Sequence, residues 1–241
     1  MRRAFAAAAV LLTVACATNK NPEQQFLSEV GSLSKEEVLA RGDALLAKKK
    51  SDEARKYYSF LSDSFPNDPV GRRAALKVAD TFFNARDLES LTEAQLRYKD
   101  FANRFPNDPN RAYALLMLGK VSFAQRKGPL RDLTPVREAA DNLKLVVQLF
   151  PKSPYAQEAR ELLAKCLEDL ADHELMIATF YANSGAWQGA KQRLDFLFAN
   201  YADTAAAKSA VPLREKVQER LNPPSTPPPT PTPPTKSAGQ H

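Results

Sequence analysis

A five-residue motif recurs along the chain and limits what the chain can fold into. The sequence FPNDP stands at residues 65–69 and again at 105–109, FPKSP follows at 150–154, and a looser copy, YADTA, occupies 201–205. Proline cannot continue a helix, whereas Asp or Ser followed by Pro is typical of an N-cap and a first helical position. We therefore predict that each motif ends one helix and starts the next, with its aromatic residue packed on the joint.

The segments between these motifs have the apolar spacing of helices, and one column of small residues recurs in them. An alanine stands twelve residues before the second position of each motif, and a large residue follows four positions after that alanine. The pairs are Ala54 and Tyr58, Ala94 and Tyr98, Ala139 and Leu143, and Ala190 and Leu194. Small residues let paired helices approach closely, and large residues fill the groove between them.

This register, with its terminal proline, resembles the tetratricopeptide repeat, and Gly42 and Gly119 would supply the small residue of the first helix. The motif spacings of 40, 45 and 51 residues exceed the usual period of about 34. The excess falls in loops near residues 84–91 and 126–134 and in a longer helix over about 155–181. We predict an all-α fold over residues 35–221, a tetratricopeptide-like solenoid of about five helix pairs, the last incomplete.

The N-terminus, MRRAFAAAAVLLTVAC, has the pattern of an export signal, with two arginines before a short apolar stretch. Its last four residues resemble the bacterial lipobox, in which the cysteine becomes the lipidated first residue, although Leu12 lies four rather than three places before Cys16. An ordinary signal peptide with an incidental cysteine is the alternative. The resemblance implies a signal peptide over residues 1–15, lipidation of Cys16 and a tether over 16–34. Ala17, where an Asp would favour inner-membrane retention, implies the outer membrane.

Charge and composition give expectations for a nucleic-acid partner, for the C-terminal segment and for Cys166. The net charge is +6, and the single dense basic run, residues 48–50, falls where a helix is predicted to end, so we expect no nucleic-acid partner. Residues 222–241 are Pro-rich and lack core residues, which predicts a disordered tail. Cys166 lies on an apolar helical face and is expected to be a buried hydrophobic residue.

No pattern of a catalytic or metal site occurs in the sequence. His241 lies in the Pro-rich tail, and His173 has acidic neighbours but no second His or Cys at ligand spacing. The sequence also lacks the nucleophile-elbow, P-loop and dinucleotide-binding glycine motifs. We therefore expect no enzymatic activity, no metal and no cofactor.

The last third of the chain carries a more specific resemblance. The stretch from FPKSPYAQEAR to PLREK includes a Gly185-Ala186-Trp187 turn and Arg193, and Arg131-Asp132 precedes a predicted helix upstream. Together with the lipobox and the order of the repeats, these features resemble the BamD family, the lipoproteins of the outer-membrane β-barrel assembly machinery, over residues 34 to 220.

The resemblance implies binding rather than catalysis. A lipid-anchored scaffold on the periplasmic face of the outer membrane would bind the central barrel-assembly protein through its C-terminal repeats. Its N-terminal repeats would bind the signal strand of unfolded outer-membrane proteins. Another outer-membrane repeat lipoprotein, such as a secretin pilotin or a cell-envelope or division coordinator, is the alternative function, and a purely structural envelope linker is a third.

The resemblance implies two groups of candidate binding residues. The candidates for partner binding are Arg193, Trp187 and Tyr181, and those for lining a substrate groove are Phe82, Phe83, Tyr98 and Tyr113. For each of these residues a purely structural role is the alternative. Arg193 could pair with Asp195 or Glu215 on the surface, Trp187 could pack between repeats, and the four aromatic residues could belong to the core.

Overall fold

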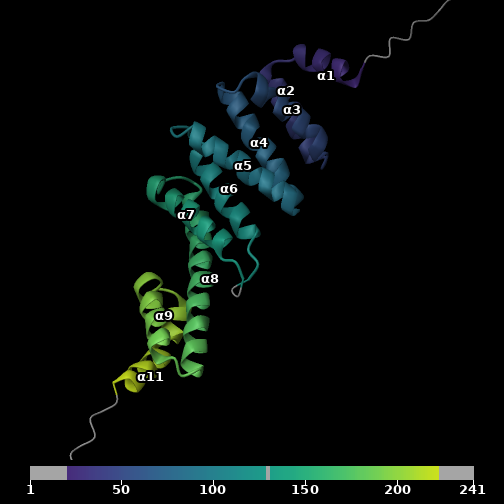
Figure 1. The fold of residues 1–241 in the computed structure, drawn as a ribbon. Helices are drawn as coiled ribbons and strands as arrows, with labels where there is room; N and C mark the ends of the chain where they lie inside the picture. Colours follow the sequence, from purple (N-terminus) through teal and green to yellow (C-terminus); the bar gives the residue numbers. More distant parts are fainter. Residues whose placement is uncertain (1–20, 129–130, 223–241) are drawn as a thin grey trace, which may run out of the picture. The chain divides into compact units, whose positions relative to one another are not determined.

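The computed structural model describes residues 21–128 and 131–222, and all regular secondary structure in these two ranges is helical (Figure 1). This confirms the all-α prediction. The chain divides into two compact units, Met1–Val78 and Ala79–His241, and the division falls inside helix α4 (Pro69–Ala85). The signal peptide, Cys16 and nearly all of the Pro-rich tail lie outside the described residues.

The first unit contains α1 (Pro22–Gly31), α2 (Lys35–Ala47), α3 (Ser51–Ser64) and the start of α4. Helix α2 begins with a capping box, in which the Ser34 hydroxyl and the Glu37 carboxylate each bond to the other's backbone amide. Helix α1 lies in the segment expected to be a tether. Its Val30 is buried, and its Glu29 accepts a hydrogen bond of 3.0 Å from the Tyr57 hydroxyl. Residues 22–31 are therefore a packed helix rather than a flexible tether.

The second unit continues from α4 with α5 (Leu88–Arg104), α6 (Arg111–Ala124), α7 (Thr134–Leu149), α8 (Ala156–Asn183), α9 (Trp187–Asn200), α10 (Ala205–Ser209) and α11 (Val211–Leu221). In this unit, α5 to α9 pack on their neighbours in sequence, whereas α10 packs on α8 and α11 on α9. Helix α8 has 28 residues, which agrees with the long helix predicted there, and both α7 and α9 pack against it (Figure 1).

The small and large residues of the repeat register meet as the sequence predicts. Ala54, Ala94, Ala139 and Ala190 are fully buried, and so are the large residues that follow them. A Cβ atom on Gly42 would come within 2.5 Å of the Tyr58 ring, and one on Gly119 within 2.6 Å of the Leu143 side chain. Close approach of α2 to α3 and of α6 to α7 therefore depends on glycine at these two positions.

All four copies of the recurring motif share one hydrogen bond. In each copy the amide three residues after the aromatic residue donates to the carbonyl of that aromatic residue. The four bonds run from Asp68 to Phe65, from Asp108 to Phe105, from Ser153 to Phe150 and from Thr204 to Tyr201, at 3.0–3.1 Å. The motif is therefore a joint between helices, as predicted.

The starts of two helices differ from the prediction. Helix α4 begins at Pro69, and the Asp68 carboxylate accepts a hydrogen bond of 2.8 Å from the Val70 amide. Helices α6 and α8 begin at Arg111 and Ala156, two residues after the proline that each motif offers as the first helical position, although the start of α8 agrees with the long helix predicted from about residue 155. Their first amides bond to the carbonyls of Asp108 and Ser153, three residues back, so one tighter turn precedes each α-helix.

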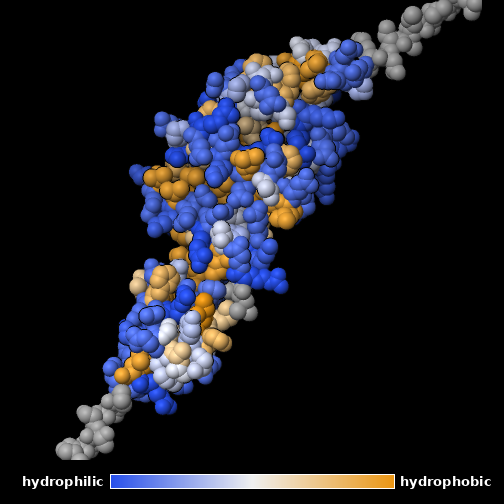
Figure 2. All heavy atoms as spheres, in the orientation of Figure 1, coloured by the Kyte–Doolittle hydropathy of each residue, from blue (hydrophilic) through white to orange (hydrophobic). Residues whose placement is uncertain are grey.

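Most of the face in view in Figure 2 is covered by hydrophilic residues, and the apolar ones are scattered among them. None of the helices formed by residues 21–128 and 131–222 combines the length and the apolar character needed to span a membrane.

Candidate functional site

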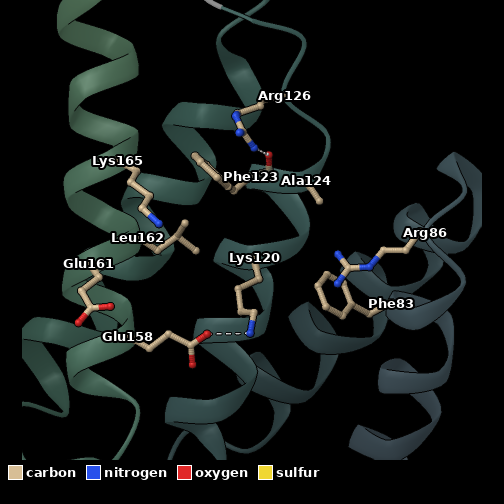
Figure 3. Close-up of a pocket in the computed structure, with 10 residues that line it drawn as sticks. All are labelled: Phe83, Arg86, Lys120, Phe123, Ala124, Arg126, Glu158, Glu161, Leu162 and Lys165. Atoms are coloured by element: carbon tan, nitrogen blue, oxygen red, sulfur yellow. Dashed lines mark hydrogen bonds and ion pairs between the residues drawn. The ribbon is translucent and has the colours of Figure 1, made fainter.

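A cavity of about 410 Å³ opens among α4, α6 and α8 in the second unit (Figure 3). Three helices and the residues that directly follow two of them contribute its principal side chains. These are Phe83 of α4 and Arg86 after it, Lys120 and Phe123 of α6 and Arg126 after it, and Glu158, Glu161, Leu162 and Lys165 of α8. The helices bring together residues that lie up to 82 positions apart in the sequence.

An arginine covers each of the two phenylalanine rings in this cavity. The guanidinium of Arg86 lies 4.0 Å from the centre of the Phe83 ring, and that of Arg126 lies 3.7 Å from the centre of the Phe123 ring. Arg126 also donates a hydrogen bond of 3.0 Å to the Phe123 carbonyl. Stacked guanidinium groups keep their edge N–H donors available to an anion, so each pair offers an apolar face beside a positive charge.

Arg86 adopts a backbone conformation that favours glycine. Its φ is 67°, in the left-handed region, directly after the last residue of α4. A non-glycine residue there costs about 1–2 kcal/mol. The chain therefore holds an arginine at the edge of the cavity where a glycine would be less strained.

Positive charge exceeds negative charge around the cavity, which four basic and two acidic side chains line. Lys120 pairs with Glu158 at 2.8 Å across α6 and α8 (Figure 3), and Arg126 lies 3.6 Å from Asp169. Within the described residues, no acidic side chain forms an ion pair with Arg86 or Lys165. The cavity is therefore suited to a ligand with both a negative charge and an apolar group.

The structure places the four predicted groove aromatics in different surroundings. Phe83 lines the cavity but is only 5% exposed, and Tyr98 is fully buried. Phe82 lines a separate pocket of about 440 Å³ with residues of α5, where the Arg97 guanidinium lies 5.3 Å from its ring centre. These residues do not line one common groove.

Tyr98 and Tyr113 instead meet at one carboxylate. Their hydroxyls donate hydrogen bonds of 2.5 and 2.6 Å to the same oxygen of Asp80 on α4. Burial, followed by the negative charge of Asp80, raises the pKa of both tyrosines well above the ordinary value. This cluster joins α4, α5 and α6 and is part of the core.

Arg193 forms an ion pair with a partner that the sequence did not indicate. Its guanidinium lies 3.1 Å from a carboxylate oxygen of Glu174 on α8, whose side chain is almost fully buried. Asp195, one of the two partners considered from the sequence, pairs with Lys191 at 2.5 Å. The Arg193 side chain is 42% exposed, so its outer edge faces solvent while its inner edge is held by Glu174.

Trp187 and Tyr181 are partly buried, and both pack against the apolar cluster of α8, α9 and α11. The Arg220 guanidinium lies 5.6 Å from the Trp187 ring centre, which connects α11 to the start of α9. A Cβ atom on Gly189 would lie 3.3 Å from the Tyr181 ring. Packing within the last repeat accounts for both aromatic residues, whereas their neighbour Phe180 is 69% exposed.

None of the sequence patterns above points to Arg86, Phe123, Arg126 or Lys165, but the sequence contains a signal for the first three of them. Phe-x-x-Arg occurs at residues 83–86 and again at 123–126. The interval is 40 residues, the same as between the two FPNDP motifs. Both copies lie at the end of the first helix of a repeat, and their phenylalanines are the two rings of the cavity that an arginine covers.

Metal binding and the two cysteines are the remaining subjects of the sequence predictions. No group of three His, Cys, Asp or Glu side chains able to hold a metal ion is found among residues 21–128 and 131–222. Cys166 is fully buried, and burial, with the nearby Asp169 charge, raises the pKa of its thiol to about 12. Cys16 lies outside the described residues, so its lipidation stays a prediction.

Comparison with known proteins gives consistent matches. The family model of YfiO, an outer membrane lipoprotein, matches residues 32–227. A protein of Haemophilus influenzae is 29% identical over 203 residues, which is 80% of this chain and 76% of the relative. A protein of Pasteurella multocida is 27% identical over 228 residues, 90% of this chain and 84% of the relative. Both are named outer membrane protein assembly factor BamD.

Among solved structures, a tetratricopeptide-repeat protein of Thermus thermophilus aligns with 78% of this chain and 99% of its own, at a TM-score of 0.41 and 19% identity. The match to the family model carries the assignment because it spans the described repeats from α2 through α11. The resemblance to BamD is confirmed, and the chain belongs to the YfiO family of outer membrane lipoproteins.

Proposed function

We propose that the chain is a lipid-anchored, non-catalytic assembly factor for outer-membrane β-barrel proteins, tethered to the periplasmic face of the outer membrane. The observation that supports this most strongly is the family match over residues 32–227, together with relatives that are named as outer-membrane assembly factors. The lipobox pattern at Cys16 supports the tether, because several acyl chains on one residue anchor a protein far more firmly than one chain does.

The proposed docking surface for the central assembly protein surrounds Arg193 in the last repeat. A guanidinium has five N–H donors in a fixed plane, and Glu174 accepts from only one edge of it. The buried Glu174 thus fixes the direction of the side chain, and the outer donors remain available to a carboxylate of a partner. Phe180, which is 69% exposed on α8 of the same repeat, would add apolar contact.

The proposed site for unfolded substrates is the cavity among α4, α6 and α8. An unfolded barrel protein presents extended segments with alternating apolar and polar side chains. The half-buried Phe123 and Leu162 can contact apolar side chains, while the basic residues attract acidic groups. Binding of such segments would use the first helices of successive repeats.

Affinity purification from detergent-solubilised outer membranes tests the proposed function. A tagged full-length chain is expected to recover the central barrel-assembly protein. Recovery of a secretin, or of cell-wall proteins alone, would instead favour the pilotin or division-coordinator function and contradict the proposal.

A variant pair separates docking from folding in the same experiment. Replacing Arg193 with Gln together with Glu174 with Gln removes the charge from the surface without leaving a buried carboxylate unpaired. We expect this double variant to recover much less of the central assembly protein, and Lys152→Glu, at an exposed position of the third joint, to recover the native amount. Circular dichroism spectra identical to that of the native chain would show that folding is unchanged.

A further inference from the structure

Three aromatic residues lie around the turn between α8 and α9. Phe180 is 69% exposed, its ring centre lies 6.0 Å from that of Tyr181, and Trp187 is the first residue of α9. Tyr181 and Trp187 are only partly buried against the apolar cluster of the last repeat, so part of each ring also meets water. Exposed apolar groups that cluster, unlike single ones, mark a binding surface. We call these three residues the aromatic surface.

Helix α11 brings the C-terminal segment of the chain to the aromatic surface. It packs against α9 (Figure 1), and its Arg220 guanidinium lies 5.6 Å from the Trp187 ring centre. Leu221, which ends the helix, packs on the same apolar cluster as Trp187. Residues 223–241 therefore follow directly on a helix end beside Trp187. A segment linked this closely meets the surface at an effective concentration of about 1 mM, so a weak intrinsic affinity is enough to hold it there.

The composition of residues 223–234 suits an aromatic surface. Eight of these twelve residues are proline, and the other four are Ser and Thr. Such a sequence favours the polyproline II helix, which has three residues per turn, so Pro228, Pro231 and Pro234 would lie along one edge of it. Polyproline II segments bind to aromatic-lined surfaces and lose little chain entropy, because the helix is already formed before binding. We call these three residues the proline edge.

We propose that residues 223–234 bind to the aromatic surface of their own chain as a polyproline II helix, with the proline edge against the rings of Phe180 and Trp187. The segment thereby covers an apolar surface that otherwise faces water. Phe180 also belongs to the proposed docking surface around Arg193, so the bound segment shields part of that surface until a partner displaces it. This last consequence rests on the proposed function.

The chain has one tryptophan, Trp187, so tryptophan fluorescence reports on the aromatic surface directly. Acrylamide quenching compares the purified full chain with two full-length variants that have the same proline content as each other. Pro228→Ser with Pro231→Ser interrupts the proline edge, whereas the control, Pro227→Ser with Pro233→Ser, leaves it intact. The first variant should raise the quenching constant of Trp187 about twofold, because the ring loses a cover held at a millimolar effective concentration. The control should keep the native constant.

Substitution of exposed phenylalanines tests the other side of the contact. Phe180→Ala should raise the quenching constant as the interrupted proline edge does, and combining the two changes should give no further increase, because both remove the same contact. The matched control is Phe196→Ala on α9, where a ring that is 46% exposed lies 6.0 Å from the Tyr201 ring. It should keep the native constant. A synthetic peptide of residues 222–241, added at about 1 mM to the variant with the interrupted proline edge, should restore the protection of Trp187.

Three results would overturn the inference. They are equal quenching constants for the native chain and both proline variants, an additive effect of Phe180→Ala and the interrupted proline edge, and no restoration of protection by the peptide. Protection that is lost when the chain is diluted would place the segment on a second copy and would also contradict the proposal.

Affinity purification from membranes tests the shielding of the docking surface separately. The variant with the interrupted proline edge should recover more of the central assembly protein than the native chain does, and equal recovery would contradict the shielding. The quenching measurements need only purified chain and a synthetic peptide. Their outcome is therefore independent of whether the central assembly protein is recovered at all.

Discussion

The guanidinium of Arg193 on α9 lies 3.1 Å from the carboxylate of Glu174 on α8, and the Glu174 side chain is only 7% exposed. Replacing Arg193 with Ala would leave a buried carboxylate without its cation. We expect a loss of roughly 1–3 kcal/mol in the free energy of unfolding, measured by urea denaturation. Adding Glu174→Gln to the Arg193→Ala variant should recover part of this loss, because a neutral amide is less costly to bury than an unpaired charge.

An exposed pair on the same helix is the matched comparison. Lys191 and Asp195 are 43% and 44% exposed, so Lys191→Ala should cost about 0–1 kcal/mol. Equally small losses of stability for Arg193→Ala and Lys191→Ala would mean that the buried Glu174 carboxylate does not need Arg193 as its cation. The direction of the guanidinium would then have to be fixed in another way.

Gly42 and Gly119 permit the close approach of two helix pairs. Added Cβ atoms would come within 2.5 Å of Tyr58 and 2.6 Å of Leu143, and both of those residues are fully buried. We expect Gly42→Ala and Gly119→Ala to destabilise the protein by roughly 1–3 kcal/mol each, because crowding a packed core forces neighbouring residues to shift. Urea denaturation followed by circular dichroism measures the change.

Gly31 provides the control for this prediction. It ends α1, and a Cβ atom there would meet no atom within 4 Å. Gly31→Ala should therefore be neutral or stabilising by up to about 1 kcal/mol, since alanine favours helix over glycine. A similar loss of stability at all three positions would mean that backbone freedom, rather than space, determines the requirement for glycine.

Much of the fold could be predicted from the sequence because its signals are local. The joint at FPNDP and the Ala54 and Tyr58 register depend on proline, capping and spacing within a few turns of helix. The motif places the starts of α6 and α8 two residues too early, since Pro in a tight turn and Pro in the first turn of an α-helix have the same sequence signal. Helix α1 was missed because its segment is mostly polar, with few apolar positions.

The candidate site was less predictable because its contacts are long-range. Glu174 lies nineteen positions before Arg193, and no short-range pattern marks the two as partners. The cavity combines side chains of three helices, so spacing within any one of them does not reveal it. The Phe-x-x-Arg pairs become informative only once the repeat register places both at the same end of corresponding helices.

Lipidation of Cys16 can be tested in cells. Cys16→Ala should prevent acylation and move the protein from the membrane fraction to the periplasmic fraction, because the acyl chains on this cysteine are the proposed anchor. Fractionation of cells and metabolic labelling with palmitate measure both effects. A variant that still fractionates with the membrane and carries label would show that the N-terminus is not a lipobox.

Cys166 should be protected from thiol reagents in the native protein. Burial raises the pKa of its thiol to about 12, and the side chain is fully buried, so little thiolate is present or accessible at pH 8. In the Cys16→Ala chain, where it is the one remaining cysteine, we expect Ellman's reagent to react slowly with native protein and quickly in urea. Fast reaction without denaturant would mean that α8 opens locally.

The two tyrosines at Asp80 predict how stability changes at high pH. The pKa values of Tyr98 and Tyr113 are raised in the folded protein, whereas the same tyrosines in the unfolded chain ionise near pH 10. Above pH 10 the unfolded chain therefore binds fewer protons than the folded protein, and stability falls as pH rises. Each of the two tyrosines contributes a loss that approaches about 1.4 kcal/mol per pH unit as that tyrosine becomes fully ionised in the unfolded chain.

Tyr98→Phe isolates one of these contributions. Tyr57 and Tyr201, whose pKa values are also raised, are common to both proteins and cancel in the comparison. Between pH 10 and 11 the variant should lose about 1 kcal/mol less stability than the native chain. Its stability at pH 7 should be lower than that of the native chain, because Asp80 accepts from Tyr113 but no longer from residue 98. Urea denaturation across this range gives both curves, and parallel curves would show that the folded protein releases the Tyr98 proton as readily as the unfolded chain does.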